Sequence, residues 1–307
     1  MKLKRPLRRL GFHALKNLAT VAATGGPDRV RAWGERLGRA DFQLRPRLKH
    51  RLIEALTELD RRRDDLQLNQ PIPLILKTAY QTNDRALLEV LALYASRAPI
   101  DALLPPIHVR NIDQLDQARA AKRGVILVGM HMGNGVALAA HLNQHVAPTH
   151  VVYRESNKIP RGFFHQGLTR LMASAIGTDG VDGGLRASLK VLKRDEMLFI
   201  LADQGRKGAT PDHAFLEKPF LLPTGPAQLA VKTGAPMVAM FLTNVGRGWQ
   251  FDALPPIWPE GSGKIEHLNQ RLIELMEGHI LQHPQWWSWH QRRWSKEAFD
   301  HPEIGAH

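Results

Sequence analysis

Polar side chains that could do chemistry follow two short apolar segments in the middle of the chain. His131 comes directly after the run VILVGM and stands before Gly133, Asn134 and Gly135. A histidine in this position can act as a general base on a hydroxyl group, although a capping turn with an incidental histidine fits the same pattern. Arg154 comes directly after the run HVVY. Its guanidinium could stabilise an oxyanion or bind a phosphate, or it could be an ordinary surface residue.

A third apolar run, LFILA, is followed by Asp203 and Gln204. A carboxylate at a strand end can orient a histidine that follows a neighbouring strand, and Asp203 is our candidate for this role. The alternative is that Asp203 only begins a turn, since aspartate near glycine is common in turns.

The elements that must position these residues alternate between strands and helices. Apolar runs predict strands over residues 125–130, 150–154, 197–202, 236–243 and 249–254, and helical spacing predicts helices over 112–122, 135–144, 160–176, 185–193, 226–233 and 264–282. This alternation predicts an α/β fold with a mostly parallel central sheet flanked by helices. Ligands of such sheets bind beyond the carboxyl ends of the strands, where the three candidates fall.

The segment before residue 107 has a different character. Residues 28–98 show helical periodicity throughout, so we expect a basic helical N-terminal region over residues 1–106 and an α/β core over residues 107–307.

Five stretches together resemble one family, the bacterial lipid A late acyltransferases (lauroyl and myristoyl transferases) of the lysophospholipid acyltransferase-like superfamily. They occur in the family's order over residues 120–296 and are HMGNGV, YRESN, ADQG, LLPTGPAQLAVKTGAPMVA and PQWWSWHQRRW. The resemblance implies transfer of a fatty acyl chain from an acyl carrier protein thioester to a hydroxyl group of a membrane lipid, without a metal, a cofactor or a covalent enzyme intermediate. It implies catalytic roles for His131, Arg154 and Asp203, and substrate-binding roles for the matching residues Asn134, Asn157, Gln204, Thr224 and Arg292.

The chain departs from the family pattern at position 136. The family pattern is a histidine, four further residues and then an acid, which would fall at position 136; this chain has Val136 there, and Gly135 replaces the usual tryptophan. Loss of the group that orients a catalytic histidine lowers the rate by orders of magnitude. We therefore expect Asp203 to substitute for the missing acid, with Glu155 and Asp179 as weaker candidates. The alternative is a non-catalytic lipid-binding relative.

The positive charge of the chain is concentrated at its beginning. The formal net charge is +13, and residues 1–52 carry +11 of it. This asymmetry, with no zinc-finger or RNP-type motif, argues against a nucleic-acid binder. An apolar stripe of Leu3, Leu7, Leu10, Ala14, Leu18 and Val21 predicts a basic amphipathic helix.

This helix could lie on an anionic membrane or pack on the body of the protein. We expect the former, because no acidic residue precedes Asp28. Members of the family that the chain resembles typically begin with a membrane-spanning helix, whereas this chain has the basic amphipathic helix instead. The predicted location is therefore peripheral, on the cytoplasmic face of the inner membrane.

Two further patterns carry less weight. His141 and His145 have the spacing of a helical zinc pair, but no third ligand is evident, and we expect no metal site. The tryptophans at 286, 287, 289 and 294 fall on a predicted short terminal helix, where they could lie at a membrane interface or close the core, and the core is favoured.

Overall fold

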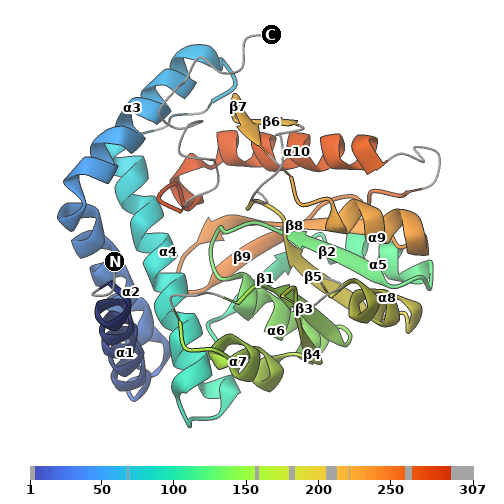
Figure 1. The fold of residues 1–307 in the computed structure, drawn as a ribbon, viewed down its shortest axis with the longest axis horizontal. Coiled ribbons are helices and arrows are strands. Elements are labelled where there is room, and N and C mark those ends of the chain that lie inside the picture. Colours follow the sequence, from blue (N-terminus) through green and yellow to red (C-terminus); the bar gives the residue numbers. More distant parts are fainter. Residues whose placement is uncertain are drawn as a thin grey trace.

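The computed structural model describes residues 4–66, 68, 70–155, 159–179, 184–204, 213–220, 222–259 and 265–291. A seven-stranded sheet lies at the centre of this part of the chain, with helices around it (Figure 1). The helices are α1 (Lys4–Ala23), α2 (Gly26–Leu44), α3 (Pro46–Arg62), α4 (Ile72–Ala95), α5 (Ile112–Ala120), α6 (Gly135–His145), α7 (Phe163–Leu171), α8 (Leu185–Lys193), α9 (Gly225–Thr233) and α10 (Ile265–Gln282), with short 3-10 helices η1 (Ile100–Ala102) and η2 (Pro284–Trp286). The strands are β1 (Ile107–Arg110), β2 (Val125–Gly129), β3 (Thr149–Tyr153), β4 (Ser174–Gly177), β5 (Met197–Leu201), β6 (His213–Phe215), β7 (Lys218–Phe220), β8 (Met237–Val245) and β9 (Trp249–Ala253).

The sheet is mostly parallel, as the sequence predicts. Its strand order is β1-β9-β8-β2-β5-β3-β4, and β8 and β9 form its antiparallel pair. The central strand β2 is buried along its whole length, which explains its continuous run of apolar residues. The predicted α/β class with a helical N-terminal region is confirmed.

The carboxyl ends of four neighbouring strands lie level with one another. Gly129 of β2 pairs with Leu201 of β5, and Tyr153 of β3 pairs with Gly177 of β4. Thr149 and Met197 pair at the start of β3 and β5, so the same register carries across the middle of the sheet. The segments that leave these strands therefore begin at one edge of the sheet.

Four strands and one helix end differ from the sequence-based expectation. The predicted helix over 160–176 is wrong at its end, because α7 stops at Leu171 and Ser174–Gly177 form β4. β1, β6 and β7 were not predicted either. These four strands have three or four residues each, which is too short for a periodicity of two to stand out.

The N-terminal helices pack closely on α4, which lies between them and the sheet in Figure 1. Gly34 and Gly38 on α2 make this approach possible. A Cβ atom at Gly34 would lie 2.5 Å from the Cα of Arg85, and one at Gly38 would lie 2.5 Å from the Cα of Gln81. Any larger side chain at these positions would push α2 away from α4.

Helix α1 packs on the body through a face different from the predicted apolar stripe. Phe12, Ala19 and Ala22 are buried, whereas Leu10 is 67% exposed and Val21 is 53% exposed. The small alanines let α1 approach its neighbours closely, so the packing face is not the face with the largest side chains. Part of the predicted stripe is thus left in contact with solvent.

The C-terminal tryptophans extend the core. Trp287 is fully buried and Trp289 is 5% exposed, in favour of the core alternative, while Trp294 lies outside the described residues. The predicted terminal helix is limited here to the three residues of η2, after which Trp287 has an extended backbone.

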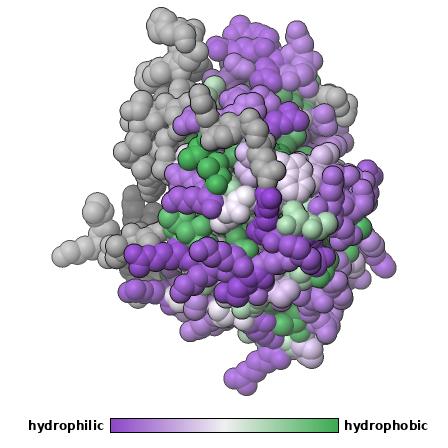
Figure 2. Space-filling view, turned by 90° about the vertical axis from the view of Figure 1, so that its right-hand side faces the viewer, coloured by the Kyte–Doolittle hydropathy of each residue, from purple (hydrophilic) through white to green (hydrophobic). Residues whose placement is uncertain are grey.

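The surface and the helices give two further observations. The face seen in Figure 2 is mainly hydrophilic, with hydrophobic residues in small separate groups. None of the described helices combines the length and the apolar character needed to cross a membrane.

Candidate active site

The structure brings His131 and Asp203 into direct contact at the carboxyl edge of the sheet. His131 follows β2 and Asp203 follows β5, the neighbouring strand. The imidazole Nδ1 of His131 lies 2.6 Å from Oδ1 of Asp203, and the backbone N–H of His131 donates to Oδ2 at 3.0 Å. One carboxylate therefore holds both the ring and the backbone of the histidine.

This arrangement fixes which ring nitrogen can act on a substrate. A carboxylate accepts hydrogen bonds, so Nδ1 carries the proton and Nε2 keeps its lone pair. The His131 side chain is 25% exposed, whereas that of Asp203 is fully buried. The imidazole can thus reach a substrate hydroxyl while its partner remains shielded from water.

The segment that follows η2 forms hydrogen bonds with both His131 and Asp203. The indole Nε1–H of Trp287 donates to Oδ2 of Asp203 at 2.9 Å. The hydroxyl of Ser288 donates to the carbonyl oxygen of His131 at 2.7 Å, and Met132 forms a β-bridge with Trp287. Sequence analysis assigned neither Trp287 nor Ser288 to the site. The dense tryptophan block was the available signal, but its spacing does not reveal the partner of each indole.

Asn134 lies at the start of α6 and connects the His131 turn to α4. Its Oδ1 accepts from the backbone N–H of Ala137, as an N-cap does, and its Nδ2 donates to Oε2 of Glu89 at 2.9 Å. Asn134 is 1% exposed. Both ends of its amide thus bind protein groups, and its part in substrate binding stays a prediction.

Glu89 and Arg85 form a buried ion pair behind this turn. Their closest atoms are 2.9 Å apart, and Trp249 donates from Nε1 to Oε2 of Glu89 at 2.8 Å. The Arg85 guanidinium also donates to the carbonyl oxygens of residues 246–248 and lies 4.1 Å from the centroid of the Trp249 ring. These donors satisfy the buried charges. Sequence analysis missed both residues, although two charges four apart in a largely apolar helix are a recognisable sign.

The remaining candidates lie around the same edge of the sheet. Arg154 is exposed at the end of β3, two strands from β2. Gln204 donates to Oε1 of Gln291 at 3.1 Å, and Thr224 stands at the start of α9. Asn157 and Arg292 lie outside the described residues.

Comparison with known proteins identifies the family of this chain. The family model described as bacterial lipid A biosynthesis acyltransferase matches residues 29–296. The chain belongs to this family.

Curated relatives of this family member include two mycobacterial proteins. The phosphatidylinositol mannoside acyltransferase of Mycobacterium tuberculosis is 27% identical over 191 residues, which are 61% of this chain and 59% of that protein. Its namesake from Mycolicibacterium smegmatis is 26% identical over 200 residues, 63% of this chain and 64% of that protein. The matches thus span about three fifths of these relatives.

One solved structure is also similar to this family member. It is that of the 1-acyl-sn-glycerophosphate acyltransferase PlsC from Thermotoga maritima, with a TM-score of 0.41 and 16% identity. The likeness covers 87% of this chain and 100% of that chain.

Position 136 is where the sequence resemblance led us to expect an acid. Val136 is half-buried and packs against the core. Of the two weaker substitute acids, Glu155 accepts from the backbone N–H of Gly162, and Asp179 accepts from the backbone N–H of Glu155. Both contacts lie at the ends of β3 and β4, so Asp203 is the candidate acid that contacts His131.

The two histidines of α6 do not form part of a larger cluster of potential metal ligands. The rings of His141 and His145 lie 4.7 Å apart, and burial, followed by the nearby His145, lowers the pKa of His141. Within the described ranges no group of three or more histidine, aspartate or glutamate residues could hold a metal ion.

Proposed function

We propose that this chain is a membrane-peripheral O-acyltransferase. It moves a fatty acyl chain from an acyl carrier protein thioester to a hydroxyl group of a membrane glycolipid, of the lipid A type or of a related class. The observation that supports the proposal most strongly is the contact of the accessible imidazole of His131 with the buried carboxylate of Asp203. Membership of the acyltransferase family supports the reaction class.

In the proposed reaction His131 acts as the general base. Its Nε2 takes the proton from the acceptor hydroxyl while the hydroxyl oxygen attacks the thioester carbonyl carbon. The tetrahedral intermediate then collapses, the C–S bond breaks, and the departing sulfur receives the proton from Nε2. Asp203 holds Nδ1–H and stabilises the imidazolium that forms between the two steps.

Arg154 takes the second catalytic role in this proposal. Its guanidinium stabilises the thioester oxyanion or binds a phosphate of the acceptor, which are the two tasks suited to a planar cation. Asn134, Asn157, Gln204, Thr224 and Arg292 remain our predicted substrate-binding residues.

Acyl transfer with purified components tests the assignment. Wild-type protein is incubated with acyl carrier protein thioesters, or with coenzyme A thioesters, and with lipid A precursors or phosphatidylinositol mannosides as acceptors. We expect transfer that His131→Ala lowers by about 10³-fold or more, while His50→Ala, on the exposed surface of α3, keeps the wild-type rate. Unchanged transfer by His131→Ala would overturn the proposed base.

The second candidate is a non-catalytic lipid-binding relative. The valine at position 136, where the family has an acid, is the observation in its favour. This candidate predicts that the protein floats with liposomes but transfers no acyl chain to any acceptor. Transfer that depends on His131 would exclude it.

We propose that α1 holds the enzyme on the anionic cytoplasmic face of the inner membrane. The support comes from the exposed Leu10 and Val21 and from the +11 charge of residues 1–52. Vesicles with phosphatidylglycerol should bind the protein more tightly than pure phosphatidylcholine vesicles, and added salt should weaken the binding. Leu10→Gln with Val21→Gln should also weaken it. Equal binding to both vesicle types would contradict the proposal.

A further inference from the structure

Four acidic or basic side chains form a row along the carboxyl edge of the sheet. Each of them stands two residues beyond a strand end, and those four strand ends lie level in the sheet register. In sheet order they are His131, Asp203, Glu155 and Asp179. His131 and Asp203 are the proposed base and its partner, and Glu155 and Asp179 line a separate pocket.

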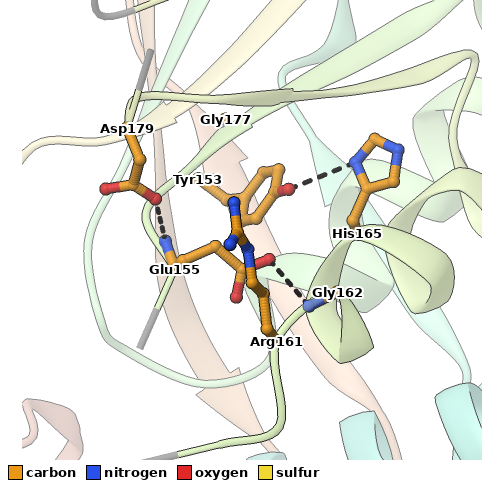
Figure 3. A pocket seen from close by; sticks show the side chains of 7 residues that line it. All are labelled: Tyr153, Glu155, Arg161, Gly162, His165, Gly177 and Asp179. Atoms are coloured by element: carbon orange, nitrogen blue, oxygen red, sulfur yellow. Dashed lines mark hydrogen bonds between the residues drawn. The ribbon is translucent and has the colours of Figure 1, made fainter. Parts of the chain in front are cut away.

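This pocket opens beyond β3 and β4 and has a volume of about 400 Å³. Its wall is formed by the end of β3, the segment before α7, the first turn of α7 and the end of β4. Figure 3 shows the polar side chains grouped around it, with Arg161 between Asp179 and His165. The lining residues are Tyr153, Glu155, Arg161, Gly162, His165, Gly177 and Asp179.

Hydrogen bonds within the wall hold both carboxylates in place. Oδ2 of Asp179 accepts from the backbone N–H of Glu155 at 3.0 Å, and Oε1 of Glu155 accepts from the backbone N–H of Gly162 at 3.3 Å. The hydroxyl of Tyr153 lies 3.1 Å from Nδ1 of His165 (Figure 3). The pocket is thus built from mutually supported side chains.

One acceptor in this wall lacks a donor. Oε2 of Glu155 is buried and has no hydrogen-bond partner among the residues that the structure describes. Buried carboxylate oxygens are nearly always hydrogen-bonded, so Glu155 keeps one unmet acceptor in this conformation. Because this oxygen is out of contact with solvent, a ligand in the pocket reaches it only after a covering group moves.

The charge of the wall selects the kind of ligand. Among the lining residues that the structure describes, the formal charges of two carboxylates and one guanidinium sum to −1. Burial, followed by the charges of Glu155 and Asp179, raises the pKa of the Tyr153 hydroxyl. Two carboxylates in the wall repel an anion such as phosphate, and their oxygens can accept hydrogen bonds from the hydroxyl groups of a neutral ligand.

The position of the pocket indicates which part of the acceptor it can hold. Glu155 follows a strand two places from the strand that His131 follows, which corresponds to about 10 Å along the sheet edge. A six-membered ring with bonds of about 1.5 Å is roughly 3 Å across, and roughly 6 Å across with the oxygen atoms on its opposite carbons included. The ring in the pocket and the hydroxyl at His131 must therefore belong to different units of one headgroup.

We propose that the pocket lined by Tyr153, Glu155, Arg161, His165 and Asp179 binds a neutral, hydroxyl-rich ring of the acceptor headgroup. At least one further unit separates this ring from the hydroxyl that is acylated at His131. The binding of such a ring is independent of the reaction, whereas its identity as part of the acceptor rests on the proposed function.

Direct binding tests the pocket without any acyl transfer. Saturation-transfer NMR is recorded on the full-length protein with methyl glucoside, with myo-inositol and with inorganic phosphate. We expect wild type to bind a neutral probe, and Asp179→Asn and Arg161→Gln to weaken that binding about 10-fold or more. Asp116→Asn, an exposed change of the same kind on α5, should bind like wild type. Binding of phosphate alone, or equal binding by the pocket variants, would overturn the proposal.

Kinetics then link the pocket to the acceptor. We compare kcat/KM for a glycosylated acceptor with kcat/KM for diacylglycerol. In Asp179→Asn the ratio of the two values should fall at least 10-fold, because KM for the glycosylated acceptor rises. An unchanged ratio in an active enzyme would contradict the proposal that the pocket binds a ring of the acceptor, and it would leave the acyltransferase proposal unaffected. Neutral-ring binding that Asp179→Asn abolishes, in a protein that transfers no acyl chain, would support the pocket and remove the proposed function.

Discussion

Asp203 uses both of its carboxylate oxygens to hold neighbouring groups. Oδ1 faces the imidazole of His131, while Oδ2 accepts from the His131 backbone and from the Trp287 indole. Since these donors come from two directions, the carboxylate has one position in which all of them are satisfied. This explains how an acid far away in the sequence can orient the histidine without an acid at position 136.

Replacing Asp203 by asparagine should remove most of the activity. The amide keeps the volume but lacks the charge that stabilises a protonated imidazole and can donate toward Nδ1, which favours the wrong tautomer. We expect kcat to fall about 10³- to 10⁴-fold while thermal unfolding still shows a folded protein. A rate within a few fold of wild type would show that Asp203 does not orient the base.

The Trp287→Phe variant isolates the contribution of the indole donor. Phenylalanine retains most of the apolar packing but cannot donate to Oδ2 of Asp203. Loss of one hydrogen bond to a charged group should lower kcat about 10-fold, because Asp203 is then less firmly positioned. Trp289→Phe is the matched control, because the indole of Trp289 donates to the carbonyl oxygen of Pro284. This variant should lower kcat less.

Introducing an acid at position 136 should not accelerate the reaction. Val136 is half-buried against the core, and Asp203 already binds Nδ1 of His131. Val136→Glu would place a second carboxylate in a partly apolar position where its charge is poorly solvated. We expect kcat of Val136→Glu to be equal to or below the wild-type value. A clear increase in kcat would mean that the missing acid limits the wild-type enzyme.

At the scale of elements, the sequence predicts long buried segments well and short or context-dependent ones poorly. β2 and β5 are recognisable from continuous apolar runs, and α8 begins and ends at the predicted residues. β4 has four residues and follows α7 so closely that one helix was predicted across both. The packing face of α1 depends on how closely alanines approach α2 and α4, and its own periodicity does not contain that information.

The same limit applies to the candidate site. Strand order decides which strand ends are neighbours, and β5 lies between β2 and β3 although β3 comes earlier in the chain. The preference for Asp203 over Glu155 was made without this order, and it is the order that makes Asp203 the neighbour of His131. The contribution of α4, through Glu89, depends on a tertiary contact across 45 residues and could not be read from spacing.

Replacing Glu89 of α4 by glutamine should strongly lower the stability of the protein. The side chains of Arg85 and Glu89 are 1% and 3% exposed, and the variant leaves the buried guanidinium with the more distant carboxylate of Glu35, at 3.9 Å, as its charge partner. We expect the free energy of unfolding to fall by about 3–5 kcal/mol in urea titrations. Glu58→Gln, which breaks an exposed pairing with Arg61 and Arg62 on α3, should change it little. Equal effects of both variants would contradict a special role for the buried pair.

At the scale of the whole molecule, charge and chemistry occupy different regions. The excess positive charge belongs to the first 52 residues, on helices that pack against α4. The row from His131 to Asp179 lies across the carboxyl edge of the sheet. α4 touches both regions, since α2 packs on it and its Glu89 binds the turn after His131. Helix α4 therefore connects the basic N-terminal helices with the turn that carries His131.

Two buried titratable groups, His279 and Asp84, have pKa shifts whose contributions to the pH dependence of stability should largely offset each other. Burial lowers the pKa of His279 to about 4, so its neutral form stabilises the fold fully above pH 6.5, and this contribution is lost as the pH falls toward 4. Burial raises the pKa of Asp84 to about 6. Its contribution has the opposite sign, because the folded state favours the protonated carboxyl group. The stability that this proton adds at low pH is lost as the pH rises through about 6.

Asp84→Asn separates the two effects. The amide removes the cost of a buried charge at neutral pH, so we expect the variant to be about 2–3 kcal/mol more stable than wild type at pH 7.5. This advantage should shrink steadily toward pH 4, where wild-type Asp84 is itself protonated in the folded state. The variant should then show the histidine-driven loss of stability that the wild-type protein conceals, measured as the free energy of unfolding in urea at several pH values. A constant difference between the two proteins from pH 7.5 to pH 4 would mean that Asp84 does not titrate in the folded protein in this range.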